Sequence, residues 1–253
     1  MKNHTEGPDF ICIGGARCGT TWLYRNMRAH PSIWMPHIKE LHYFDRDVAY
    51  SSPSHLATSS FWRRMIDFSP NNRKFRGLLL RNFVKNTMLF RFSDLLWDFQ
   101  FFFSYYDDEW YLNLFRKSKG RIYGEITPAY GILNSNDVNK IKTLLPDLKV
   151  IFLIRNPIYR TWSQLRKNAQ HTFPLDRINR IIKNPDMSLR NDYLRTMDNW
   201  LNAFGKDSLL LCFYDEIKED PCSLLSRVYD FVGLDDTNSV MNDLVSSKIN
   251  SAP

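Results

Sequence analysis

The segment FICIGGARCGTTWLYRNM, Phe10–Met27, constrains the fold of this chain more than any other part of it. It starts with a short apolar run that predicts a buried strand, turns through glycines and continues with Leu23 and Met27 at helical spacing. Gly14 and Gly19 have the GxxxxG spacing of phosphate-binding loops, in which backbone N–H groups and a helix N-terminus face one anion. The segment therefore predicts a strand–loop–helix unit that holds an anionic group.

Further strand-like runs recur along the chain, with helical patterns between or after them. The strand-like runs are Asp9–Ile13, Arg121–Pro128, Lys149–Arg155 and Ser208–Ile217. The helical patterns are Thr20–Ala29, Asp137–Leu145, Pro157–Lys167, Leu189–Phe204 and Pro221–Val232. Because strands that alternate with helices are typical of parallel sheets, we expect an α/β protein with a P-loop-like three-layer fold, a central parallel sheet and helices on both faces.

One long stretch, residues 50–106, fits this alternation poorly. It is rich in serine at first and then basic and aromatic. We interpret it as a partly helical insertion over the sheet edge, either a lid that binds an acceptor or ordinary helical packing. Since no internal repeat or linker interrupts the rest, residues 1–253 are expected to form a single domain that carries this insertion.

The composition favours an anionic partner. The chain of 253 residues has a formal net charge of +7, which suits nucleotides, polyanionic glycans, nucleic acid or membrane surfaces. No nucleic-acid-binding motif is present, so we expect no nucleic-acid partner. The N-terminus has no apolar signal region and no apolar run approaches the ~20 residues of a membrane helix, so a cytoplasmic protein without a transmembrane segment is expected.

The four cysteines show no metal-ligand spacing. They are Cys12, Cys18, Cys212 and Cys222, with no CxxC pair and no histidine cluster nearby. We expect no metal site, and free thiols that are buried at Cys12 and Cys212, which lie in apolar strand-like runs.

The loop lacks two features of nucleoside triphosphatases. Thr20 replaces the lysine that reaches the terminal phosphates, and the strand-like run Lys149–Arg155 ends in an arginine where a magnesium-binding carboxylate would be expected. Arg17 supplies a cation, and Thr20 and Thr21 supply hydroxyl groups. This combination favours a phosphate-linked group whose charge is offset by side chains and backbone alone.

A second anion site is predicted where the run Lys149–Arg155 passes into a helix. Arg155 projects from the strand end, Pro157 suits the first helical position, and Ser163 lies about two turns into the helix. Arg155 and Ser163 would then bind one phosphate, the first as a fork and the second as a hydroxyl donor. Arg160 and Arg166 are interpreted as solvated charges of the helix.

GGARCGTTWL followed by LIRNPIYRTWSQ resembles the paired cofactor signatures of the PAPS-dependent sulfotransferase family, and is closest in motif to its heparan sulfate-type and bacterial members. The resemblance implies 3′-phosphoadenosine 5′-phosphosulfate (PAPS) as sulfuryl donor, adenosine 3′,5′-bisphosphate (PAP) as product, and no metal. It implies that Arg155 and Ser163 grip the 3′-phosphate. The 5′-phosphosulfate would be held by Arg17, Cys18, Gly19, Thr20 and Thr21. Trp22 and Trp162 would stack on adenine or belong to the core.

Other segments extend the resemblance over nearly all of the chain outside the insertion. They are His30–Asp45, Asp107–Tyr130 and Asn199–Asp236. Three departures stand out: Arg17 replaces the lysine common in the heparan type, Ile126 replaces another lysine, and the sequence stops at KINSAP where relatives continue with a helical stretch. The last departure indicates a truncated or unusually short protein.

The resemblance places a general base at Glu40, in IKELHYF, where bulky apolar neighbours would raise the carboxyl pKa. His37 and His42 are alternative bases because histidine titrates near neutrality. Arg17 would stabilise charge on the bridging oxygen and the sulfuryl group. Alkylation of Cys18 would block the loop. The residues expected on the acceptor side are His42, Asp45, Glu125, Thr127 and Tyr130.

Two other functions remain open from the residues alone. One is a P-loop kinase or NTPase that acts on a small molecule, which would require magnesium. The other is a non-enzymatic module that binds polyanions through Arg63–Arg91. We expect a small-molecule or glycan acceptor with a hydroxyl or amine, and the sequence leaves its identity open among a glycan, a lipid, a polyketide-like alcohol and a protein tyrosine. It also leaves the oligomeric state open.

Overall fold

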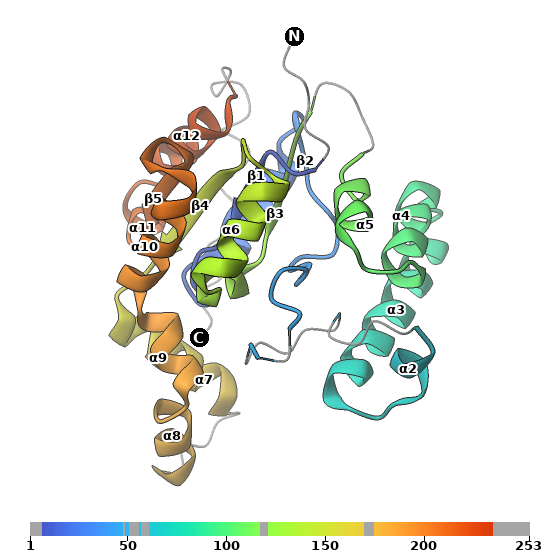
Figure 1. The fold of residues 1–253 in the computed structure, drawn as a ribbon, viewed down its shortest axis with the longest axis horizontal. Helices are drawn as coiled ribbons and strands as arrows, with labels where there is room; N and C mark the ends of the chain where they lie inside the picture. The colour runs from blue at the N-terminus through green and yellow to red at the C-terminus, as the bar shows by residue number, and fades with distance from the viewer. Residues whose placement is uncertain are drawn as a thin grey trace.

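Parallel strands form one sheet at the centre of the chain (Figure 1). The computed structural model describes residues 7–47, 49–50, 56, 61–116, 121–169 and 175–234. In this part of the chain the strands are β1 (Phe10–Cys12), β2 (Ile33–Trp34), β3 (Ile122–Ile126), β4 (Lys149–Ile154) and β5 (Leu209–Phe213). Their order is β2-β3-β1-β4-β5, and every pair is parallel. The predicted α/β class with a central parallel sheet is confirmed.

The register brings the functional segments to one edge of the sheet. Ile11 of β1 stands level with Glu125 of β3 and Val150 of β4. Since the three strands run in the same direction, their carboxyl ends meet, and the segments that follow them begin side by side. The close pairing of β1 and β3 depends on Gly124, because a Cβ there would lie 2.1 Å from the ring of Phe10.

Helices cover both faces of the sheet. The helices outside the predicted insertion include α1 (Thr20–Ala29), α6 (Ser135–Leu144), α7 (Pro157–Ala169), α8 (Leu175–Ile182), α9 (Pro185–Asn191), α10 (Tyr193–Phe204), α11 (Glu216–Glu219) and α12 (Pro221–Val232), with short 3₁₀ turns at Pro128–Ile132 and Lys206–Ser208. The faces are covered by α1, α6, α10 and α12, whereas α8 packs against α7 and α9. Alternate side chains of β1 point to opposite faces, so Ile11 packs in a cluster with α6 and α10, whereas Phe10 packs in a cluster with α1 and α12. The result is a helix–sheet–helix sandwich with a core on each side.

Two predicted elements differ from the structure by more than two residues at one end. The helix expected over Leu189–Phe204 is broken at Asp192, whose carboxylate accepts from the backbone N–H of Arg195 at 3.0 Å and caps α10. A capping aspartate competes with the continuing helix, which periodicity alone does not reveal. The strand expected over Ser208–Ile217 ends at Phe213, whose N–H donates to Glu216 of the following turn at 2.7 Å.

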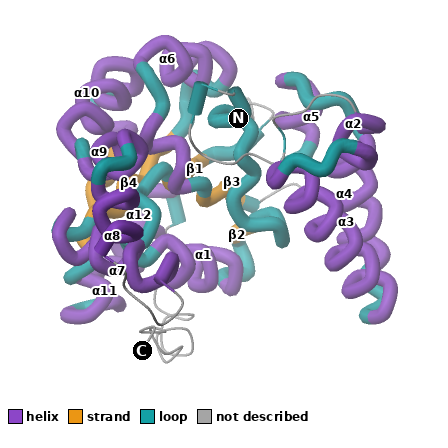
Figure 2. Tube along the Cα trace, turned by 90° about the horizontal axis from the view of Figure 1, so that it is seen from below, coloured by secondary structure: helices purple, strands orange, loops and turns teal. Residues whose placement is uncertain are grey.

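The stretch predicted as an insertion forms the helices α2 (Phe61–Ile66), α3 (Pro70–Met88) and α4 (Phe92–Phe103), and α5 (Asp108–Asn113) returns the chain to the sheet. Residues 51–55 and 57–60 of the predicted insertion lie outside the described residues. The α3–α4 hairpin stands beside the β2 edge, on the opposite side of the molecule from α8 and α12 (Figures 1 and 2). Phe75 and Trp97 join the core cluster above β1, and Trp97 Nε1 donates to the carbonyl of Leu114 at 3.0 Å.

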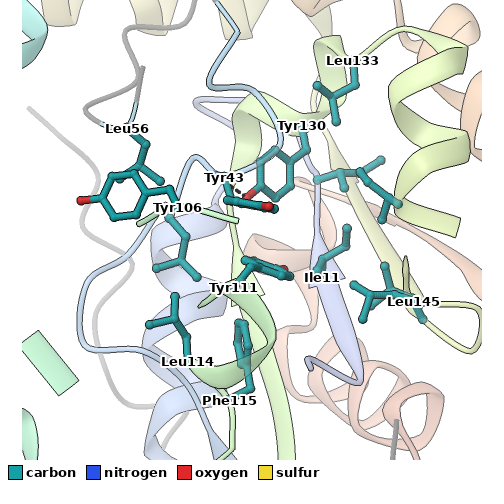
Figure 3. Packing of buried hydrophobic residues seen from close by; sticks show 14 of the residues in the cluster. Ile11, Tyr43, Leu56, Tyr106, Tyr111, Leu114, Phe115, Tyr130, Leu133 and Leu145 are labelled. Atoms are coloured by element: carbon teal, nitrogen blue, oxygen red, sulfur yellow. Dashed lines mark hydrogen bonds between the residues drawn. The ribbon is translucent and has the colours of Figure 1, made fainter. Parts of the chain in front are cut away.

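That core cluster is strongly aromatic (Figure 3). The rings of Tyr43 and Tyr111 stack at 4.7 Å between centroids, and Tyr130 lies next to them.

No helix among the described residues combines the length and the hydrophobicity that crossing a membrane requires.

Candidate functional site

The loop between β1 and α1 lies tightly against β4. A Cβ on Gly14 would lie 2.5 Å from the backbone nitrogen of Leu153, so this position accepts only glycine. Gly19 has φ 91° and precedes α1 without a side-chain cap, and the first turn of α1 holds no acidic residue. The positive end of α1 therefore stands at the carboxyl edge of the sheet, as an anion-binding loop requires.

The two predicted anion sites are joined. Arg17 Nε donates to Ser163 Oγ of α7 at 3.0 Å, and Arg155 Nη1 donates to the carbonyl of Arg17 at 3.3 Å. Burial, and then the positive charges of Arg155 and Arg166, lower the pKa of Arg17. Arg155 also stacks on the ring of Tyr214 at 4.0 Å. The loop and α7 thus concentrate positive charge that a bound anion would offset.

Arg160 was predicted to be a solvated charge, and this prediction is wrong. Its side chain is fully buried, because α7 turns it toward α9, where it binds Asn191 and the carbonyl of Met187. Its Nη1 has no hydrogen-bond partner among the described residues. Arg160, Gln164 and Lys167 line the same cleft. Their i, i+4, i+7 spacing is the signal in the sequence that would have identified this face of α7.

These residues border a cleft of about 410 Å³ at the carboxyl edge of the sheet. Arg17, Thr20 and Thr21 lie on its wall, as do Glu40 and His42. The cleft therefore unites the loop after β1, the segment around Glu40, and α7.

Two basic residues of the cleft come from segments to which sequence analysis assigned no site residue. Lys74 reaches the cleft from α3, and Arg190 reaches it from α9. The position of Lys74 in the cleft is what an acceptor-binding lid would require, and the position of Phe75 in the core is what ordinary helical packing would require. Both interpretations of the insertion therefore remain predictions.

Glu40 carries a carboxylate with two cationic neighbours. Lys39 Nζ donates to Glu40 Oε1 at 2.5 Å, and His42 Nε2 lies 3.6 Å from Oε2. Burial alone would raise the pKa of Glu40, but His42 and Lys39 outweigh it and hold the pKa well below its usual range. The predicted upward shift is therefore wrong in sign, because the apolar neighbours in sequence are not the groups nearest to the carboxylate.

His42 is held by a buried carboxylate. Its Nδ1 lies 2.7 Å from Oδ2 of Asp45, which is fully buried. Burial alone would lower the pKa of His42, but Asp45 and Glu40 outweigh it and raise the pKa to about 9. His42 is thus an imidazolium at neutral pH, which corrects its role as an alternative base. His37 lies elsewhere, 2.7 Å from Asp98 of α4 and against the ring of Trp97.

Glu125 was expected on the acceptor side, together with Thr127 and Tyr130, but all three are buried behind the cleft. Glu125 accepts hydrogen bonds from Tyr111 Oη at 2.6 Å, Thr127 Oγ1 at 2.8 Å and Tyr130 Oη at 3.1 Å. Burial raises the pKa of Glu125 to about 7, although these three hydroxyls favour the carboxylate. The neighbouring Pro128 lines the cleft instead.

Thr127 and Tyr130, which Glu125 holds by hydrogen bonds, in turn bind the backbone of the segment around Glu40. The backbone N–H of Leu41 donates to Thr127 Oγ1 at 3.0 Å, and that of Tyr43 donates to Tyr130 Oη at 3.1 Å. Glu40 and His42 have φ angles of 67° and 59°. Non-glycine residues adopt this left-handed conformation only when the surrounding structure holds them in it. The buried hydroxyls supply such a hold on either side of His42.

Three smaller predictions meet different outcomes. Trp22 is 8% exposed in the core cluster with α12, which argues against stacking on adenine, whereas Trp162 is 51% exposed on α7. Cys18 is buried, and burial raises the pKa of its thiol to about 11, so the thiol is unreactive in the folded protein, and the blocking of the loop by its alkylation stays a prediction. Cys12 and Cys212 are buried free thiols, as predicted.

Among residues 7–234 as far as described, no His, Cys, Asp and Glu side chains cluster as metal ligands.

Comparisons with known proteins agree on one family. The model described as "Sulfotransferase family" matches residues 8–238. Heparan sulfate glucosamine 3-O-sulfotransferase 6 of Mus musculus is 28% identical over 135 residues, which are 49% of this chain and 39% of that protein. The chain thus matches well under half the length of this curated relative.

Solved structures agree on the fold. The sulfotransferase domain of the Synechococcus PCC 7002 olefin synthase superposes with a TM-score of 0.60 at 18% identity, covering 98% of this chain and 81% of that one. Mouse sulfotransferase SULT7A1 complexed with PAP superposes with a TM-score of 0.52 at 15% identity, covering 94% of this chain and 63% of that one.

Proposed function

We propose, from the premise that this chain belongs to the sulfotransferase family, that it transfers a sulfuryl group from PAPS to a hydroxyl or amine of a small-molecule or glycan acceptor. The observation that carries the proposal is the junction of Arg17, Ser163 and Arg155, which links the loop after β1 to the start of α7. One nucleotide with a phosphate at each end would meet both segments. The two alternative functions, a P-loop kinase or NTPase and a polyanion-binding module, would explain neither why the two anion sites are joined nor why the chain matches the sulfotransferase family.

The residues present fit such a nucleotide. The uncapped N-terminus of α1 suits the 5′-phosphosulfate, and Arg155 and Ser163 suit the 3′-phosphate. The unpartnered Nη1 of the buried Arg160 is a further donor that a bound anion would satisfy. When bound, PAPS supplies the sulfuryl group and a bisphosphate leaving group.

Glu40 is the proposed proton acceptor. Its low pKa keeps it ionised at any working pH, so that it can accept a hydrogen bond from an acceptor hydroxyl in the cleft. The protonated His42 orients the carboxylate, and Asp45 fixes the imidazole through Nδ1. Lys39 lies against Glu40 and lines the same cleft. A shift of Lys39 toward developing negative charge would leave Glu40 a stronger base.

Donor binding is tested by calorimetry with PAP on the folded protein. Wild type is expected to bind, and Arg155→Ala is expected to lose about tenfold or more in affinity, as one charge-assisted contact of ~1.5–3 kcal/mol implies. Arg121→Ala removes an equal charge at the start of β3, at the opposite edge of the sheet, and should bind as wild type does. Absence of PAP binding by the wild type would refute the proposal.

Catalysis is tested with labelled PAPS and a panel of hydroxyl and amine acceptors. Glu40→Gln should bind PAP normally and lose turnover, whereas Glu219→Gln at an exposed position of α11 should retain it. If Glu40→Gln turns over at the wild-type rate, Glu40 is not the base.

A further inference from the structure

The hairpin α3–α4 carries apolar surface on two sides. One side of α4 packs into the core through Trp97, Phe101 and Phe102. The other side exposes Phe92 and Phe99 to solvent by 69% and 61%. A helix with apolar residues on both sides is normally covered on both sides. We therefore expect the outer side of α4 to contact another apolar surface.

The exposed apolar surface continues around the tip of the hairpin. Met88 and Phe90, where α3 turns into α4, are 73% and 78% exposed. Phe90 has a φ of 51°, in the left-handed region, at a place after a helix end where glycine or asparagine is usual. A large aromatic side chain is thus present at the tip although the local backbone does not favour it.

The hairpin and the short helix before it carry a net positive charge. Between Phe61 and Phe103 the chain has eight Lys and Arg residues against three Asp, a large part of the +7 net charge of the whole protein. One of the three acids, Asp98, is buried between His37 and Asn86. On the outer side of α3, Arg81 and Lys85 alternate with apolar residues along an open groove of about 780 Å³.

We propose that the α3–α4 hairpin docks this protein onto the surface of an anionic lipid membrane. Met88, Phe90 and Phe92 would enter the boundary between headgroups and acyl chains, while Arg81 and Lys85 extend to the lipid phosphates. Only the tip of the hairpin enters the interface, α3 extends from it away from the lipid, and the hairpin does not span the membrane, in keeping with the charges along α3. This inference is independent of the proposed function, since no residue of the anion-binding loop takes part.

The docked orientation has a consequence for the cleft. Lys74, near the start of α3, lines the cleft, and Met88 at its end lies in the tip. At 1.5 Å per helical residue these positions are about 21 Å apart along α3. The cleft would therefore stand about 20 Å from the lipid surface, within reach of an acceptor that is anchored in it.

Co-sedimentation of the full chain with vesicles tests the proposal. Vesicles of phosphatidylcholine mixed with phosphatidylglycerol are expected to bind the protein and release it at high salt, and phosphatidylcholine alone is expected to bind it weakly. Phe90→Ser with Phe92→Ser should abolish binding, and its matched control is Leu175→Ser with Leu194→Ser, which removes two equally exposed apolar side chains on α8 and α10.

A charge variant separates the electrostatic part of the interaction. Arg81→Ser with Lys85→Ser should weaken binding about fivefold for each charge removed, and Arg25→Ser with Lys206→Ser, which lowers the net charge equally, should not. Circular dichroism and urea denaturation show whether each variant is folded. The proposal is overturned if the wild-type protein does not bind vesicles that contain phosphatidylglycerol. It is also overturned if sedimentation velocity shows a dimer that becomes a monomer in the variant with Phe90→Ser and Phe92→Ser, because a second copy of the chain would then cover this face.

Discussion

Replacement of Glu125 by glutamine should change the pH dependence of stability. In the folded protein burial raises the pKa of Glu125 to about 7, from an ordinary value of 4.5. Below pH 4.5 the group is protonated in both the folded and the unfolded states and contributes nothing to the difference. Between pH 4.5 and 7 the folded state keeps a proton that the unfolded state has lost, so the free energy of unfolding falls as pH rises. The displacement of the pKa corresponds to about 3 kcal/mol.

Glu125→Gln removes this ionisation and keeps the shape of the side chain. Relative to wild type, its free energy of unfolding should therefore rise by about 3 kcal/mol between acidic and mildly alkaline pH, whatever the offset at pH 4.5. Urea denaturation at several pH values measures the difference, and Glu219→Gln on the exposed α11 serves as the control. A difference that is constant with pH, or that changes in favour of the wild type as pH rises, would refute the reasoning.

Three further predictions concern the site and the sheet. NMR titration should find the His42 imidazole protonated up to about pH 9, and Asp45→Asn should lower that midpoint because it removes the carboxylate that stabilises the imidazolium; an unchanged midpoint would contradict this role of Asp45. Iodoacetamide should modify Cys222, which is partly exposed, before Cys18 in native protein, as peptide mass mapping can measure; rapid labelling of Cys18 would show that the loop opens. Gly124→Ala should destabilise the protein by about 1–3 kcal/mol in urea unfolding, since its Cβ would overlap the ring of Phe10, and unchanged stability would mean that β1 and β3 separate easily.

The anion-binding loop could be predicted because its determinants are local. Gly14 and Gly19 define the turn, and Arg155 follows a strand whose apolar run is plain in the sequence. Parallel strands then bring the two segments to one edge without further information. The hydrogen bond that Arg17 Nε donates to Ser163 Oγ adds a contact that the spacing did not specify.

The electrostatics of Glu40 could not be predicted in the same way. Its pKa depends on where the side chains of Lys39 and His42 point, and the positive φ of Glu40 sets that direction. The hold on this segment comes from Thr127 and Tyr130, which are more than eighty positions away in sequence. Such contacts arise from tertiary packing and leave no periodic pattern in the sequence.

The burial of Arg160 is another feature that tertiary packing determines and that the sequence pattern does not show. In the sequence it is one basic residue among several on α7, and only the position of α9 encloses it. The break at Asp192 that separates α9 from α10 was also missed, so the wall on that side of the cleft was not foreseen.

The hydrogen bond between Arg17 and Ser163 means that two long-range partners are already aligned in the protein alone. Fixing a flexible arginine on binding normally costs about 0.5–1.5 kcal/mol of conformational entropy, and here much of that loss has occurred during folding. A ligand that accepts from both residues therefore meets a rigid template. Variants that break the pair, such as Ser163→Ala, should then slow association as well as weaken it, because Arg17 would first have to find its productive rotamer.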